Sequence, residues 1–94
     1  MKKANTTTNF TYGDIGFNWT SVDRFETAEE AKTDCIESMK KEHSDGFTVT
    51  DRVIIRIDHV RIFDELMVIS DQMTRTSIEI INKHCAEEGD ENDI

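Results

Sequence analysis

Residues Val53 to Ile69, V-I-I-R-I-D-H-V-R-I-F-D-E-L-M-V-I, form the most aliphatic stretch of the 94-residue chain and indicate where its core lies. Read with a period of two residues, this segment and the residues before it share one apolar face, which comprises Phe47, Val49, Val53, Ile55 and Ile57. The other face is mostly charged. Because β-branched residues dominate as far as Ile62, the pattern predicts a half-buried strand.

The alternation changes its phase in the middle of this stretch. After Asp58 and His59 the apolar positions become Val60 and Ile62, which predicts a bulge or a turn followed by a second extended run to about Ile69. A β-hairpin is the simplest result. A helix over the same residues stays an alternative, because four apolar residues also fall near helical spacing, namely Val53, Ile57, Val60 and Met67.

Aromatic residues are concentrated between Phe10 and Phe25, with glycines as punctuation. This composition predicts an earlier strand over about Gly16–Arg24, with Phe17 and Trp19 on one face.

A helix is predicted next, because Thr27 and Glu30 have the spacing of a capping box. In that motif the threonine hydroxyl accepts a hydrogen bond from an early helical N–H, and the glutamate reaches back to the cap. The helix is expected to run to about Glu42 with a narrow apolar stripe, formed by Ala28, Ala31, Cys35 and Met39.

A second helix is predicted after the hairpin, with Ser70 or Asp71 as its cap and Gly89 at its end. Its apolar stripe would consist of Ser77, Ile78, Ile81 and Cys85. The predicted fold class is therefore α+β: a small antiparallel sheet, in the order β-α-β-β-α, with two helices packed on one face. We expect a flexible N-terminal arm over 1–9, a single domain over 10–89 and an acidic tail over 90–94.

Charge limits the classes of partner. The formal net charge is −9, from 20 acidic and 11 basic residues, and the last quarter is the most acidic part. Nucleic acid and anionic membranes would repel such a chain, whereas a basic protein surface would attract it. The first residues lack the apolar run of a signal peptide, and no segment is long enough to cross a bilayer, so we expect a cytoplasmic protein.

Catalytic and metal-binding motifs are not recognisable. His84 and Cys85 are adjacent, and neighbouring helical residues diverge by about 100°, so they are poorly placed to bind one ion together. Cys35 and Cys85 are expected to be reduced thiols inside helices. The sequence therefore predicts no catalytic residue, no metal ion and no cofactor.

The composition favours a non-enzymatic acidic protein-binding module. Small acidic domains of this kind are frequent among phage and mobile-element inhibitors of the anti-CRISPR and anti-restriction type, so the expected partner is a larger, basic, nucleic-acid-binding host protein. The module would act in the host cytoplasm, in one version as a nucleic-acid mimic. Oligomeric state is left open.

Two other classes are kept as alternatives. One is a regulatory or accessory subunit of a cytosolic complex that binds through an aromatic and aliphatic patch; the less favoured one is a small cysteine- or metal-dependent enzyme. The predicted partner-binding residues are acids on the two expected helices together with two aromatic residues of the first segment: Glu29, Glu30, Asp34, Glu37, Glu79, Glu87, Glu88, Tyr12 and Trp19.

Overall fold

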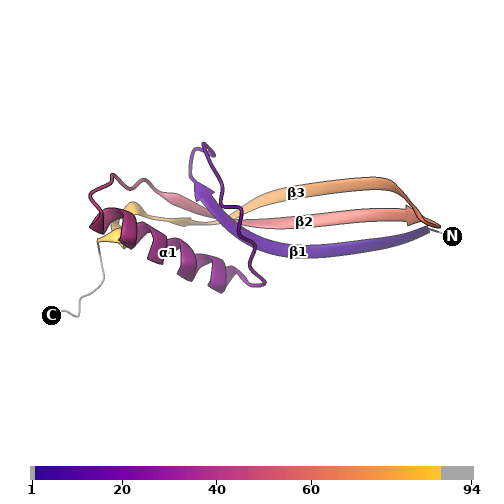
Figure 1. The fold of residues 1–94 in the computed structure, drawn as a ribbon, viewed down its shortest axis with the longest axis horizontal. Helices are drawn as coiled ribbons and strands as arrows, with labels where there is room; N and C mark the ends of the chain where they lie inside the picture. Colours follow the sequence, from indigo (N-terminus) through magenta and orange to yellow (C-terminus); the bar gives the residue numbers. More distant parts are fainter. Residues whose placement is uncertain (1, 88–94) are drawn as a thin grey trace.

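The computed structural model describes residues 2–87 and shows a long, narrow molecule that measures 61 × 25 × 19 Å (Figure 1). Its elements are β1 (Lys2–Asp14), α1 (Ala28–Ser44), β2 (Arg52–Asp64), β3 (Met67–Ile81) and a short 3-10 helix, η1 (Lys83–Ala86). The strands form one antiparallel sheet in the order β1-β2-β3, so β2 is central. The predicted β-α-β-β-α order with two packed helices is wrong: the described chain has one α-helix.

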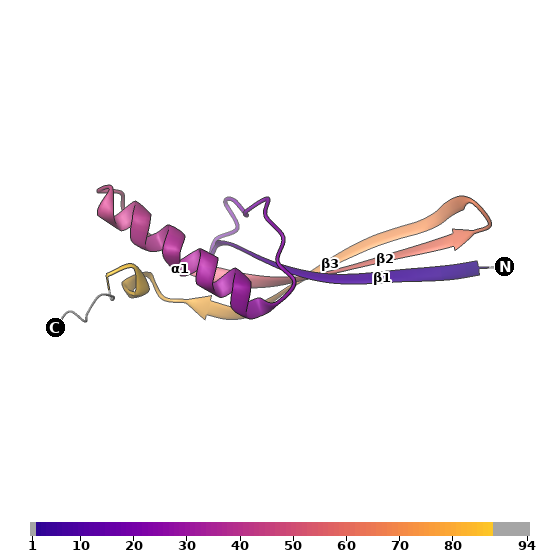
Figure 2. The same ribbon diagram turned by 60° about the horizontal axis from the view of Figure 1, so that its bottom comes forward.

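The molecule has a packed head and a thin arm, as Figures 1 and 2 show. We define the arm as residues 2–9 of β1, 58–64 of β2 and 67–74 of β3. None of these residues is buried, because no other element of the described chain covers either face of the arm. The head comprises the remaining parts of the three strands together with α1, η1 and the connecting loops.

The N-terminal segment takes part in the sheet. Residues 2–9, which the sequence predicts as a flexible arm, pair with β2 from Lys2 opposite Asp64 to Asn9 opposite Ile57. Their threonines and asparagines bury little, but a strand needs only a partner for its backbone, and β2 supplies one.

The strand predicted over Gly16–Arg24 is wrong, because this segment is a loop. Its backbone pairs with β1 at one isolated bridge, from Thr20 to Gly13, and the residue that follows it, Phe25, forms a second isolated bridge with Phe10. The buried Asp14 carboxylate bends the loop back by accepting hydrogen bonds from the Gly16 N–H at 2.9 Å and Asn18 Nδ2 at 3.0 Å. It also accepts from Thr50 Oγ1, in the segment before β2, at 2.8 Å. Gly13 permits the close crossing, since a Cβ there would lie 2.7 Å from the Trp19 carbonyl oxygen.

The first helix and its capping box are confirmed. The Thr27 hydroxyl accepts from the Glu30 N–H at 3.1 Å, and Glu30 Oε1 accepts from the Thr27 N–H at 3.3 Å. Ala31, Cys35 and Met39 recur at intervals of four residues and are buried, as the apolar stripe predicts.

β2 continues through the position where a bulge or turn was predicted. The phase change at Asp58 and His59 marks a change of apolar face within one strand, because only the part of β2 before it lies in the head. The chain turns later, at Glu65 and Leu66, with Glu65 at a φ of 60°. Two register shifts do occur, and both place the extra residue in β3.

The second predicted helix is wrong: most of the segment forms β3, and only Lys83–Ala86 turns helically. Four alternate β-branched residues, Thr74, Thr76, Ile78 and Ile80, suit a strand, and β2 needs a partner on its second side. Cys85 consequently lies in η1, whereas Gly89 and the tail 90–94 fall outside the described residues.

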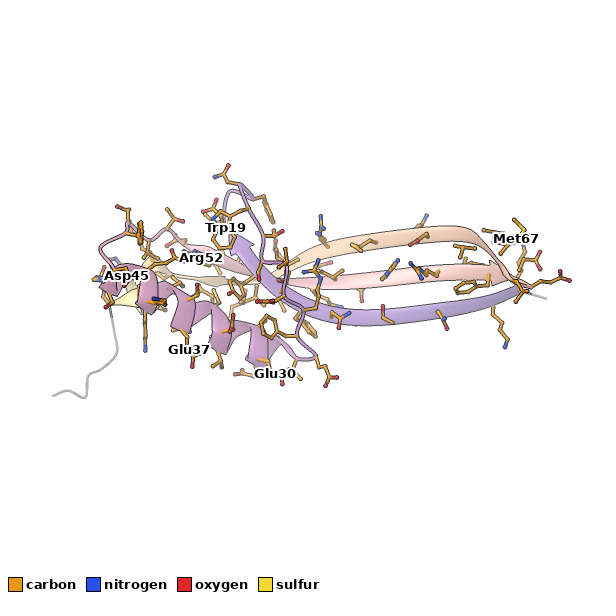
Figure 3. All side chains as sticks on the ribbon, viewed as in Figure 1. Trp19, Glu30, Glu37, Asp45, Arg52 and Met67 are labelled. Atoms are coloured by element: carbon orange, nitrogen blue, oxygen red, sulfur yellow. The ribbon has the colours of Figure 1, made fainter. Side chains whose placement is uncertain are left out.

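Apolar residues are buried on both faces of the sheet in the head. Val53, Ile55 and Ile57 cluster on one face, as the period-two pattern predicts. Phe47 and Val49, which were predicted on the same face, precede β2: Phe47 is exposed, and Val49 packs against the cluster under α1. α1 packs on the opposite face, which the sequence indicates as mostly charged, in a cluster made of Tyr12, Ala31, Cys35, Met39, Ile54, Ile81 and Ala86. The charged Arg52 on that face, labelled in Figure 3, is itself buried.

Candidate functional site

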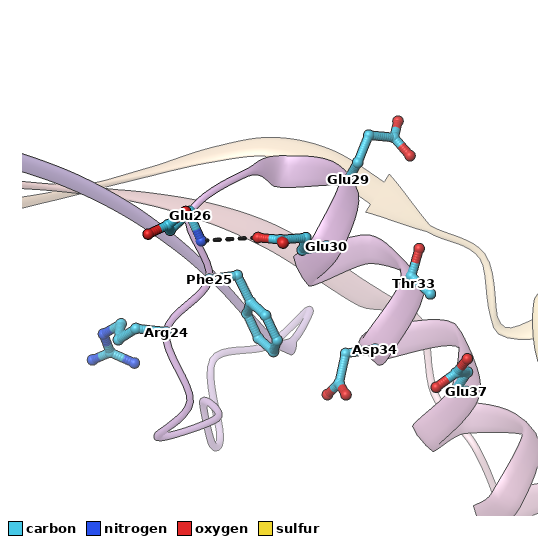
Figure 4. Close-up of a pocket in the computed structure, with 8 residues that line it drawn as sticks. All are labelled: Arg24, Phe25, Glu26, Glu29, Glu30, Thr33, Asp34 and Glu37. Carbon is cyan, nitrogen blue, oxygen red and sulfur yellow. Dashed lines mark hydrogen bonds between the residues drawn. The ribbon is translucent and has the colours of Figure 1, made fainter.

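An open groove lies between the end of the long loop and the outer side of α1 (Figure 4). Its volume is about 580 Å³. The lining residues are Arg24, Phe25, Glu26, Glu29, Glu30, Thr33, Asp34 and Glu37. We call this feature the acidic groove.

Local structure explains why these side chains converge. Residues three and four positions apart lie on the same side of a helix, so Glu30, Asp34 and Glu37 form one row along α1. The loop is tied to this row because Glu30 Oε1 also accepts from the Glu26 N–H at 3.2 Å (Figure 4). Phe25 forms the apolar wall, and its backbone pairs with Phe10 at 2.9 and 2.8 Å.

The groove is strongly negative. Five carboxylates line it, and Arg24 is the one cation among its lining residues. Arg24 Nη1 donates to the carbonyl oxygens of Ser21 and Asp23, both at 3.1 Å, so this guanidinium is committed to the loop backbone. Five carboxylates against one guanidinium give the lining residues a net formal charge of −4, so a basic group would be attracted into the groove.

The groove is connected to the core through Tyr12. Its hydroxyl donates to Asp34 Oδ2 at 2.7 Å, while its ring is buried beside Phe25 and Trp19. Burial, followed by the hydrogen bond to and the charge of Asp34, raises the pKa of Tyr12 from 10.0 to about 12. The hydrogen bond from Tyr12 therefore fixes the orientation of the Asp34 carboxylate from the core side of the groove.

Tyr12 is the single tyrosine of the chain, so this pKa is directly measurable. We expect tyrosinate absorbance in the folded protein to rise with a midpoint near pH 12, against about 10 in the unfolded chain. Because the folded-state pKa is raised, the stabilising contribution is complete below pH 10 and is lost as pH rises towards 12. Tyr12→Phe should remove this alkaline loss, and a native midpoint near 10 would contradict the contact.

The predicted partner-binding residues do not form one site. Glu29, Glu30, Asp34 and Glu37 line the acidic groove, whereas Tyr12 lies beneath it. The remaining residues are dispersed. Glu79 pairs with Lys32 at 2.8 Å, Glu87 lies 3.4 Å from His84 after η1, Trp19 sits beside Arg52, and Glu88 lies outside the described residues.

Sequence reasoning missed the loop side of the groove. Arg24, Phe25 and Glu26 were assigned to the end of a strand or left without a role, and only Glu26 carried a usable signal. It lies four residues before Glu30, which continues the helical row of acids by one turn before the cap.

The described residues also show how the cysteines and the possible metal ligands are placed. No group of three or more His, Cys, Asp or Glu side chains in that range is arranged to hold a metal ion. Both cysteines are free. Burial raises the pKa of the Cys35 thiol to about 12, which disfavours the thiolate that nucleophilic catalysis requires.

Comparison of the chain with protein-family models, curated proteins and solved structures returned no match. Among the described residues, no helix is both long and apolar enough to cross a membrane.

Proposed function

We propose that this protein is a non-enzymatic binding module whose acidic groove receives a basic segment of a larger protein. The observation that carries the proposal is the grouping of five carboxylates around one concave surface with an apolar wall at Phe25. Such a surface suits a lysine or arginine side chain, which presents a charged head and an aliphatic stem.

The partner class follows from this chemistry. Proteins that bind nucleic acid present lysine and arginine side chains to its phosphates. We therefore propose a nucleic-acid-binding host protein as the target. The module would compete with nucleic acid for that surface, as inhibitors from phages and mobile elements do. A cytoplasmic location is proposed with it, since both cysteines are free thiols and reducing compartments keep thiols in that state.

Charge-matched variants test the groove. The groove variant combines Glu26→Gln, Glu29→Gln and Glu37→Gln, which spares the cap at Glu30 and the Tyr12 contact of Asp34. We expect it to associate about 3- to 10-fold more slowly than wild type with the protein that wild type captures from host lysate, because surface carboxylates mainly accelerate encounter. The measurement is the association rate constant at low salt.

A control variant separates the groove from overall charge. Asp23→Asn, Glu65→Gln and Glu87→Gln remove the same number of charges at exposed positions that do not line the groove. The control should associate at nearly the wild-type rate. If both variants slow association equally, net charge is responsible, and the groove is not the docking surface.

A second candidate is the accessory-subunit function, which the loop before α1 favours. This loop exposes large apolar side chains, and Phe17 adopts a φ of 59° there. The exposed residues are Ile15, Phe17, Trp19 and Val22. Binding through this patch would resist salt and would be lost in Phe17→Ser, whereas binding through the acidic groove would show the opposite behaviour.

A further inference from the structure

The free edge of β3 is the longest unprotected edge in the described structure. β3 runs along the outside of the sheet (Figures 1 and 2), and every residue before Ile81 is exposed or half-buried. The inner half of β1, by contrast, is shielded by the bridges to Thr20 and Phe25. Natural edge strands are usually blunted by charged side chains, proline or bulges. β3 has no proline, and between its two bulges, over residues 70–77, its only charged residues are Asp71 and Arg75.

We propose that β3 pairs with β3 of a second copy of this chain, antiparallel and around a two-fold axis that passes beside Met73. An axis perpendicular to the sheet pairs only residues that lie on the same face. Around Met73 it places Asp71 opposite Arg75 of the second copy, and Arg75 opposite its Asp71. The interface thus contains two symmetric ion pairs flanking a methionine–methionine contact.

No neighbouring register offers the same complementarity. Moving the axis to Gln72 places Asp71 opposite Met73, and moving it to Thr74 places Arg75 opposite Met73. Glu79 is not an alternative partner, because it lies beyond a bulge on the face of α1 and pairs there with Lys32. The regular part of β3 between its two bulges, residues 70–77, is centred next to Met73.

The charges of these two side chains are available for such a pair. Within residues 2–87, no carboxylate lies within ion-pair distance of Arg75. Asp71 contacts His59 through one oxygen and Arg61 through the other, at 3.4 Å, yet half of its side chain stays exposed. A carboxylate accepts several hydrogen bonds, so a further guanidinium can join this cluster.

The same axis brings apolar residues together at both ends of the interface. Val68 becomes level with Ile78 of the second copy, and Leu66 at the arm's tip becomes level with its Ile80. Leu66 is 98% exposed and Ile80 is 63% exposed in the single chain. Pairing therefore covers apolar side chains at the arm's tip with others in the head, and it leaves α1 and the acidic groove on the opposite face.

Charge exchange tests the proposal. In analytical ultracentrifugation, wild type should form a dimer at protein concentrations of about 1 mM or below. Arg75→Asp and Asp71→Arg should each raise the dimer dissociation constant by about 30- to 100-fold, because two pairs of like charges then face each other. An equimolar mixture of the two variants should form a heterodimer, because every pair is again opposite in sign. Lys3→Asp on the other edge is the control and should leave dimerisation unchanged.

A cross-linking experiment tests the register in protein that also carries Cys85→Ser. Met73→Cys should join two copies with a short thiol-specific linker, because the axis places this position next to itself. Thr76→Cys should not, since its own copy would lie six residues away, about 20 Å along the strand. A monomeric wild type, or dimers in which Arg75→Asp has no effect, would overturn the proposal, and so would cross-linking at 76 but not 73.

Discussion

Ile55→Asp is expected to unfold the protein. Ile55 is 1% exposed and lies at the centre of the apolar cluster on the central strand β2. A carboxylate at this position would be buried without a partner, at a cost of several kcal/mol, which is comparable with the whole stability of a small domain. Denaturant unfolding followed by the fluorescence of Trp19, the single tryptophan, measures the effect.

The matched control is Ile80→Asp, on the neighbouring strand and the same face. Ile80 pairs with Val53 but remains largely exposed, so the same substitution should cost about 1 kcal/mol or less. A wild-type unfolding curve for Ile55→Asp, or equal losses for both variants, would show that the sheet face is assigned incorrectly.

Glu42→Gln should produce the second-largest effect. Glu42 Oε1 lies 2.6 Å from Arg52 Nη2, and the arginine side chain is 3% exposed. Its Nε and Nη1 atoms have no hydrogen-bond partner among residues 2–87, although its guanidinium lies 4.7 Å from the centroid of the Trp19 ring. Removing the carboxylate leaves a buried, unpaired cation, and we expect the free energy of unfolding to fall by about 2–3 kcal/mol. This loss is smaller than for a fully buried pair, because Glu42 is partly exposed.

Two further variants identify the cause of that loss. Asp45→Asn removes one partner of the exposed Lys41–Asp45 pair and should cost less than about 1 kcal/mol. Adding Arg52→Met to Glu42→Gln should recover most of the stability, because an apolar side chain then replaces the unpaired cation. If the double variant is no more stable than Glu42→Gln, the buried charge is not the origin of the loss.

Local sequence patterns predicted an element correctly where the contacts that determine it are close in sequence. The capping box from Thr27 to Glu30 and the stripe of Ala31, Cys35 and Met39 predict α1 correctly. The period of two over Val53, Ile55 and Ile57 identifies the central strand. In both cases the pattern lies within a few residues of the structure that it describes.

The prediction failed where pairing with a distant segment decides the structure. Residues 70–81 have apolar positions compatible with a helix. They form a strand instead, because their backbone pairs with the second edge of β2. The turn at Glu65 and Leu66 lacks the glycine or asparagine that usually marks a hairpin, so the end of β2 was not visible. For the same reason, residues 2–9 gave no sign of their pairing.

The candidate site was predicted in part. Four of the predicted acids share the acidic groove because helical spacing places them on one side of α1. The expectation that the C-terminal acids join them depended on a second helix. It is wrong, because that segment forms β3. Glu79 instead neutralises Lys32 across the head.

The salt dependence of association tests the central claim most directly. The rate constant for binding the captured partner should be measured over a range of NaCl concentrations, with wild type, the groove variant and the control variant, and then in the presence of double-stranded DNA. We expect wild type and control to slow steeply as salt rises, the groove variant to show a clearly smaller slope, and DNA to compete with wild type. Equal slopes for all three proteins, together with binding that DNA does not affect, would contradict the assignment of the acidic groove as the docking surface.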